Sequence, residues 1–359
     1  MKKSSKMIKS NTKTSLITYI MLIAIFVVVN IMIATGSMSF MMQDLLVPLC
    51  IYAILAVSLN LTVGILGELS LGQAGFMCIG AYSGALFSKL METTIPDALL
   101  RFPIALLFGG VCAAIFGILI GIPVLRLRGD YLAIVTLAFG EIIKNICASI
   151  YLGTDANGFH ISLKSISDMN MAKDGEMLIN GALGINGTPR DSNFLIAFII
   201  LFVTVVISYN FVNSRTGRAV MSIRDNRIAA ESVGINITKY KLITFALTAF
   251  LAGVAGVIYS HNFSTLQASK FDYNMSILVL VFVVLGGIGS IRGSIIAAIA
   301  LTLIPELLRD TIFGEYRMLF YAIILIAMML ITSNSVLKEK IGSIFGKGKN
   351  KKSKKGEVE

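Results

Sequence analysis

The chain has 359 residues, of which 56% are hydrophobic and only 14% are charged. Soluble domains average about 25% charged residues, so this composition excludes an ordinary soluble protein and predicts an integral membrane protein. The net charge of +11 does not predict nucleic-acid binding, because the basic residues gather at the two ends and in one central loop, without aromatic interleaving.

Apolar segments follow one another along the chain, each close to the roughly 20 residues that cross a bilayer. The first, 15–34, follows a basic stretch 1–14 and is too long for the apolar part of a signal peptide, so we expect it to remain as a span. We therefore predict an all-α transmembrane bundle of about ten spans over residues 15–334. The predicted spans are 15–34, 45–63, 70–90, 101–125, 130–152, 193–213, 241–260, 275–289, 294–309 and 317–334.

The distribution of Lys and Arg predicts the orientation. With a cytoplasmic N-terminus, 22 of the 31 basic residues fall in inside segments, which is the usual positive-inside bias. Both termini are then cytoplasmic, residues 153–192 form an extracytoplasmic loop, and residues 214–240 form a cytoplasmic loop. The Lys-rich tail 335–359 is expected to lie on the cytoplasmic side, near anionic lipid.

Glycines four residues apart predict close approach between spans, because small residues on one helical stripe let two backbones meet. The pairs are Gly80 with Gly84, Gly117 with Gly121, and Gly289 with Gly293. The four cysteines lie in apolar segments without a C-x-x-C pair, so we expect them to be small buried side chains.

The motifs of enzymes and of ATP binding are missing. The nearest approach to a P-loop, at 342–348, has three residues between its glycines instead of four and no Ser or Thr after the Lys. His160 and His261 have no metal-ligand partner at helical spacing, and charged residues within the spans are few. We therefore predict no enzyme activity, no metal and no bound cofactor, and we expect a partner to supply the energy for transport.

The basic loop 214–240 has a pattern suited to contact with such a partner. Residues 218–233 predict an amphipathic helix, with Gly234 ending it in a left-handed cap. Its apolar positions are Val220, Ile223, Ile228 and Val233. Docking to a partner protein and lying on the membrane surface both remain open for such a helix.

Within this loop, Ala229 and Ala230 followed by Gly234 resemble the A-A-x-x-x-G core of the coupling loop in ABC permeases, with Ile228 where that pattern has Glu. Three further segments extend the resemblance. They are 56–84, which contains AVSLNLTVG and GELSLGQAGFMCIGAYSG, 126–142, which reads RLRGDYLAIVTLAFGEI, and 285–293, which reads LGGIGSIRG. Together they resemble the permease family of branched-chain amino acid ABC transporters, more its LivM-type than its LivH-type subunit. The turn at 153–158 departs from the family pattern.

The resemblance implies an importer in the bacterial cytoplasmic membrane that carries leucine, isoleucine and valine. Its implied partners are a second permease, two ATPase subunits that use the ATP, and an extracytoplasmic binding protein. The implied ATPase-coupling residues are Arg224, Asp225, Asn226, Arg227, Ala229, Ala230, Glu231 and Gly234, and the candidate substrate-pathway residues are Asn60, Gln73, Thr136 and Glu141. A permease for urea or short-chain amides, a more distantly similar sugar permease, and an ion-coupled carrier are the alternatives.

Overall fold

The computed structural model describes residues 2–92, 94–125, 127, 129–155, 158–163 and 175–307, with residues 319, 322, 323 and 326, and side chains from residue 15 onward. Two compact units are present, Met1–Thr302 and Leu303–Glu359, and the described residues of the second are helical. The tail 335–359 lies outside the described residues, as do most of the predicted span 317–334 and residues 164–174 of the predicted outer loop.

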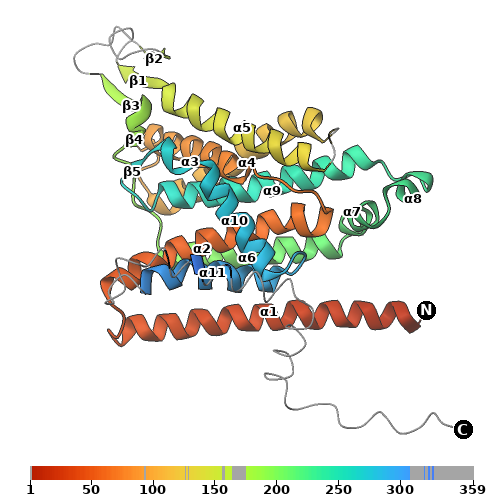
Figure 1. The fold of residues 1–359 in the computed structure, drawn as a ribbon. Helices are drawn as coiled ribbons and strands as arrows, with labels where there is room; N and C mark the ends of the chain where they lie inside the picture. Colours follow the sequence, from red (N-terminus) through yellow and green to blue (C-terminus); the bar gives the residue numbers. More distant parts are fainter. Residues whose placement is uncertain are drawn as a thin grey trace, which may run out of the picture. The chain divides into compact units, whose positions relative to one another are not determined.

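Helices dominate the structure (Figure 1). They are α1 (Lys2–Ala34), α2 (Phe40–Asn60), the π-helix η1 (Leu61–Leu66), α3 (Gln73–Leu90), α4 (Ala98–Val124), α5 (Asp130–Ser149), α6 (Phe194–Asn213), α7 (Arg215–Asp225), α8 (Arg227–Ser232), α9 (Ile237–Ser260), α10 (Tyr273–Gly286) and α11 (Ile291–Leu307). Short 3-10 turns occupy Gly181–Leu183 and Ala268–Lys270. The strands are β1 (Tyr151–Asp155), β2 (Gly158–Ser162), β3 (Glu176–Asn180), β4 (Ile185–Asn186) and β5 (Thr265–Leu266).

Among the described residues, seven helical segments are long and apolar enough to cross a membrane. They are Ser15–Ala34, Phe40–Leu66, Ala98–Val124, Asp130–Ser149, Phe194–Asn213, Ile237–Ser260 and Ala268–Gly286. The predicted count of ten is therefore not confirmed. The predicted span 70–90 corresponds to α3, which can be less apolar because it packs against other helices, and 294–309 corresponds to α11, which has only 17 residues.

Helix α3 packs in the interior against α4, α5 and α9. Its glycines make this possible: a Cβ on Gly80 would lie 2.3 Å from the Cα of Gly253, so the α3 and α9 backbones touch. Gly84 and Gly121 meet side chains of α9 equally closely, which confirms the first two glycine pairs. The third pair does not form a helical stripe, because Gly289 lies in the turn before α11 with φ +83°.

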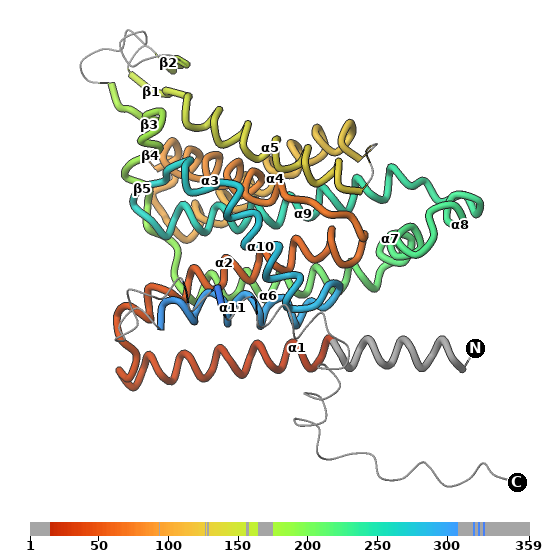
Figure 2. The backbone as a smooth tube through the Cα atoms, in the orientation of Figure 1, coloured from red at the N-terminus to blue at the C-terminus, as the bar shows by residue number. Residues whose placement is uncertain are grey.

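The helix ends identify two opposite ends of the first unit. Helix α1 packs antiparallel to α6, with Thr18 hydrogen-bonded to Tyr209 at 2.9 Å and the Phe26 ring 4.7 Å from the Phe198 ring between centroids. The Ser15 end of α1 therefore lies beside the end of α6 from which α7 and α8 continue. Figure 2 traces the chain through these helices, with α7 and α8 projecting at one end and the strands at the other.

Strands β1 to β4 lie in or next to the segment predicted only as an extracytoplasmic loop, and β5 follows α9, so the expectation of an all-α fold is corrected there. Strand β1 pairs antiparallel with β2 and β3, and β4 pairs antiparallel with β5, which follows α9. Pairing between β4 and β5 ties the segment before α6 to the segment after α9. Lys89, at the end of α3, holds the same region through an ion pair with Glu176 at 2.9 Å.

Candidate functional site

The cytoplasmic loop predicted at 214–240 forms two short helices, α7 and α8, joined at Asn226. Ser214 caps α7 by accepting a hydrogen bond from the Gly217 backbone N–H at 3.0 Å. Asn226 caps α8 in the same way through the Ala229 N–H at 3.0 Å, and its extended backbone (φ −155°) interrupts the helix. The single amphipathic helix predicted over 218–233 is therefore wrong, because the Asn226 side chain starts a new helix instead of continuing the old one.

The break divides the predicted apolar face in two. Val220 and Ile223 of α7 are buried, as predicted. On α8, however, Ile228 and Val233 are 81% and 74% exposed, and Ala230 is the buried residue. Helix α8 therefore presents apolar side chains outward, next to exposed Asp225 and Glu231 and half-buried Arg227.

Gly234 ends α8 as the sequence predicted. Its φ is +84°, in the left-handed region, and its N–H donates to the carbonyl of Glu231 at 3.0 Å. The next residue, Ile235, donates back to Ala230 at 3.1 Å and packs against the buried cluster of Ile223, Ala230 and Ile237. Helix α8 is thereby fixed to the start of α9.

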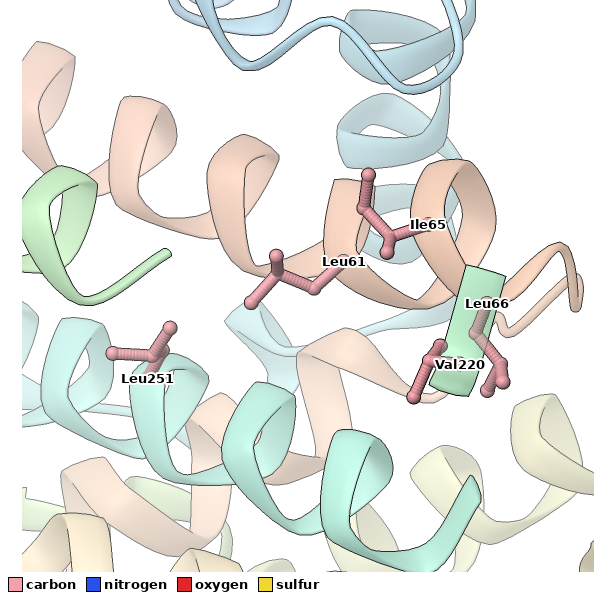
Figure 3. Packing of buried hydrophobic residues seen from close by; sticks show 5 residues of the cluster. All are labelled: Leu61, Ile65, Leu66, Val220 and Leu251. Atoms are coloured by element: carbon pink, nitrogen blue, oxygen red, sulfur yellow. The ribbon is translucent and has the colours of Figure 1, made fainter. Parts of the chain in front are cut away.

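A second apolar cluster fixes α7 to the core. Figure 3 shows Leu61, Ile65 and Leu66 of η1, Val220 of α7 and Leu251 of α9, which form this buried cluster. A Cβ on Gly217 would lie 2.2 Å from the carbonyl oxygen of Phe211, so α7 folds directly onto the end of α6. The loop is consequently a packed part of the fold rather than a separate arm.

Two charged side chains strengthen this attachment. Arg224 donates from Nη1 to the carbonyl of Gly64 in η1 at 2.9 Å and from Nη2 to Asp225 at 3.1 Å. Lys241, in the first turns of α9, forms an ion pair with Glu68, which follows η1. The side chains of Lys241 and Glu68 are only 5% and 17% exposed, so this pair is largely excluded from solvent.

Three of the four candidate pathway residues lie in the interior of the fold. Asn60, Gln73 and Thr136 are all buried. Gln73 donates to Ser58 in α2, and Thr136 accepts from the Leu71 N–H at 3.0 Å. These side chains join segments that lie next to one another in the fold.

Glu141 has a different environment. One carboxylate oxygen accepts from the Tyr273 N–H at 2.9 Å, at the first residue of α10, and the other pairs with Lys144. The carboxylate therefore neutralises both the positive end of α10 and the neighbouring ammonium group. Lys144 follows Glu141 by three residues on α5, so this ion pair is local, whereas the contact with α10 joins segments far apart in the chain.

The described residues contain no group of three or more His, Cys, Asp or Glu side chains that could hold a metal. His261 is fully buried, and its Nε2 lies 2.7 Å from the Ser88 hydroxyl. His160 lies 3.1 Å from Asp155 in the β1–β2 hairpin. Both histidines have partners within the fold.

Comparison with known proteins identifies the family to which this chain belongs. Residues 41–329 match the family described as the branched-chain amino acid transport system, permease component. The chain belongs to this permease family. The permease LivM of Salmonella typhimurium is 33% identical over 321 residues, which cover 86% of this chain and 72% of that protein. LivM of Escherichia coli is 35% identical over 292 residues, which cover 78% and 66%.

More distant relatives are named as permeases for other substrates. The ribose import permease RbsC of Haemophilus influenzae is 24% identical over 286 residues, covering 77% of this permease and 80% of that protein. No solved structure gave a significant match. The permease is thus an ABC-type, multi-pass inner-membrane protein, whose relatives are transport subunits and not enzymes.

Gly64 and Glu68 lie within the segment 56–84 but were not among the residues predicted to be functional. A signal for Glu68 was present, since a carboxylate between two apolar segments requires a partner, and Lys241 opens another apolar segment. Gly64 had no such signal, because its importance comes from a carbonyl oxygen and a close contact that only the folded permease creates.

Proposed function

We propose that this chain is one permease subunit of an ATP-driven importer that moves branched-chain amino acids into the cytoplasm. Its partners would be a second, homologous permease, two ATPase subunits and an extracytoplasmic solute-binding protein. The ATPase subunits use the ATP, and the permease itself binds no cofactor. Both termini face the cytoplasm in this proposal, together with α7 and α8.

The observation that carries the proposal is helix α8. It is capped at Asn226, ended at Gly234 and anchored through Ala230, yet it exposes Ile228 and Val233 to solvent. Exposed apolar side chains on a rigid helix are typical of a protein contact surface. We infer that α8 inserts into a groove of the ATPase, with the charged residues 225, 227 and 231 at its rim, while Arg224 turns back to the Gly64 carbonyl.

The choice of substrate is supported by the two LivM relatives, at 33% and 35% identity. Leucine, isoleucine and valine are neutral zwitterions with apolar side chains, so their path needs few charged groups. Glu141 is the candidate pathway residue best placed to meet a zwitterion, because it is partly exposed and already compensated by Lys144 and α10. Asn60, Gln73 and Thr136 would support the path from the interior.

Sugars or nucleosides are the second candidate substrate class. Family relatives named as fructose and nucleoside permeases are 26% and 24% identical to this chain. Urea and short-chain amides stay as further candidates within the ABC class, and an ion-coupled carrier is the alternative outside it.

The test is purification of the tagged permease in mild detergent, followed by ATP hydrolysis with and without a leucine-loaded binding protein. Co-purified ATPases and a second permease, stimulated by the loaded protein, would support the class and the substrate. Stimulation by ribose-loaded but not leucine-loaded protein would change the substrate class. A lone polypeptide that accumulates solute on an ion gradient would contradict the ABC assignment.

A further inference from the structure

The π-helix η1 interrupts the second apolar span between α2 and the loop that leads to α3. The N–H groups of Gly67 and Glu68 both turn back to the carbonyl of Thr62, the second at 3.2 Å. A π-turn holds one more residue than an α-turn, so it can return to α-helix only by a discrete shift of the residues that follow. Short π-segments occur often at functional sites for this reason.

One face of η1 is held by helix α7. The guanidinium group of Arg224 donates to the Gly64 carbonyl at 2.9 Å. The aliphatic part of the same side chain lies on Gly67, where a Cβ would be 2.5 Å from its Cγ. Arg224 therefore contacts both the middle of η1 and the residue that ends it.

The turn between α10 and α11 also holds η1. Asn60, fully buried just before η1, accepts from the Gly289 N–H at 2.8 Å and donates to the Ser294 hydroxyl at 2.9 Å. A Cβ on Gly64 would lie 2.3 Å from the Gly289 nitrogen, so the two backbones are in direct contact. A displacement of η1 cannot leave this turn in place.

The turn has both the backbone freedom and the space to move. Gly287 and Gly289 have φ values of +94° and +83°, which glycine adopts without strain. A cavity of about 240 Å³ lies beside the turn. It is lined by Ile65 of η1, by Tyr209, Val212 and Asn213 of α6, and by Gly289, Ser290, Ile291 and Arg292.

We propose that η1 transmits movement from the α7–α8 loop to the α10–α11 turn, with Arg224 and Asn60 as the positioning residues. The inference rests on the proposed docking of α8 to an ATPase. Movement of α7 pulls the Gly64 carbonyl through Arg224, η1 shifts, and Asn60 carries the shift to Gly289 and Ser294. ATP hydrolysis is thereby linked to a rearrangement inside the membrane.

The test uses the complete importer in proteoliposomes and measures leucine taken up per ATP hydrolysed. Arg224→Met keeps the side-chain stem on Gly67 but removes the donor to Gly64, and Asn60→Ala removes the bonds to Gly289 in the turn and to Ser294 in α11. We expect each to lower the ratio about tenfold, within the usual range of coupling between sites, with ATPase co-purification retained. Arg218→Met is the matched control, since it removes the same charge from α7 and loses only a local bond to the Asn213 carbonyl.

The double variant Arg224→Met with Asn60→Ala should be no worse than its poorer single parent, because both interrupt one chain of contacts. The inference would be overturned if the double variant showed the product of the two single effects. It would also be overturned if the single variants kept the wild-type ratio of leucine taken up per ATP hydrolysed. Loss of the ATPase from Arg224→Met alone would overturn it as well, since Arg224 would then act in docking. If Asn60→Ala does not assemble, Ser294→Ala replaces it, because it removes the hydrogen bond from Asn60 to Ser294. A wild-type ratio of leucine to ATP in Ser294→Ala would contradict the proposed transmission through η1. If the proposed function is wrong, the wild-type importer itself will show no ATP-driven uptake of leucine.

Discussion

Glu68 and Lys241 form a largely buried ion pair at the point where η1 meets the start of α9. A buried ion pair contributes little net stability compared with apolar residues, because both charges lose their hydration. Removal of one partner alone is costly, since the remaining charge has no compensation. The pair therefore matters for holding this junction in one arrangement.

We predict that Glu68→Gln destabilises the permease by about 3 kcal/mol, because Lys241 is left buried and unpaired. The double variant Glu68→Gln with Lys241→Met should recover most of that loss. Thermal unfolding of the purified protein in detergent measures both. Glu176→Gln, which breaks a pair whose carboxylate side chain is 66% exposed, is the control and should cost about 0.5 kcal/mol. Equal losses for Glu68→Gln and Glu176→Gln would contradict the role of burial.

At the scale of elements, the contacts of α3 and of α8 rest on different physics. Helix α3 meets α9 and α5 through glycines, so its position is set by close backbone contact. Helix α8 is held by caps and by one buried residue, Ala230, and its remaining faces are free for a partner. Substitutions in the two helices should accordingly affect stability in one case and assembly in the other.

Gly80→Ala should destabilise the permease by about 3 kcal/mol, because the added Cβ would lie 2.2 Å from the Gly253 carbonyl oxygen and a backbone cannot give way cheaply. Gly140→Ala is the matched control on α5. Its Cβ would have no neighbour nearer than 3.6 Å, and alanine favours a helix over glycine by about 1 kcal/mol. Melting temperatures in detergent compare the two, and a Gly140→Ala variant as unstable as Gly80→Ala would refute the packing argument.

Ala229→Arg should abolish co-purification of the ATPase while leaving the melting temperature of the permease unchanged, because Ala229 is exposed on α8. Leu183→Arg, an exposed position in the strand region at the opposite end, is the control for added charge and bulk. Retention of the ATPase by Ala229→Arg would place the docking surface elsewhere.

At the scale of the whole molecule, α7 and α8 lie at the opposite end of the first unit from the strands (Figure 1). The Ser15 end of α1 lies at the α7 end, through the antiparallel packing of α1 and α6. An N-terminus and a basic loop at one common end agree with the positive-inside prediction.

The orientation predicts the accessibility of two introduced cysteines. In a background with the four natural cysteines replaced, Ile161→Cys in β2 should react with a membrane-impermeant maleimide in right-side-out vesicles only. Ser232→Cys in α8 should react in inside-out vesicles only. Both positions are exposed, so access depends on the side of the membrane. The reverse labelling pattern would invert the orientation.

By itself, the sequence determined the membrane class, the family, the basic loop and its end at Gly234, because composition, periodicity and a left-handed glycine are local or additive properties. Tertiary structure decided what each polar residue does. The placement of Asn60 against Gly289 and of Arg224 against Gly64 depends on contacts between segments far apart in the chain. Hydropathy alone could not give the number of spans, because it reflects contact with lipid. The interior helix α3 contacts other helices instead, so it needs small residues more than apolar ones.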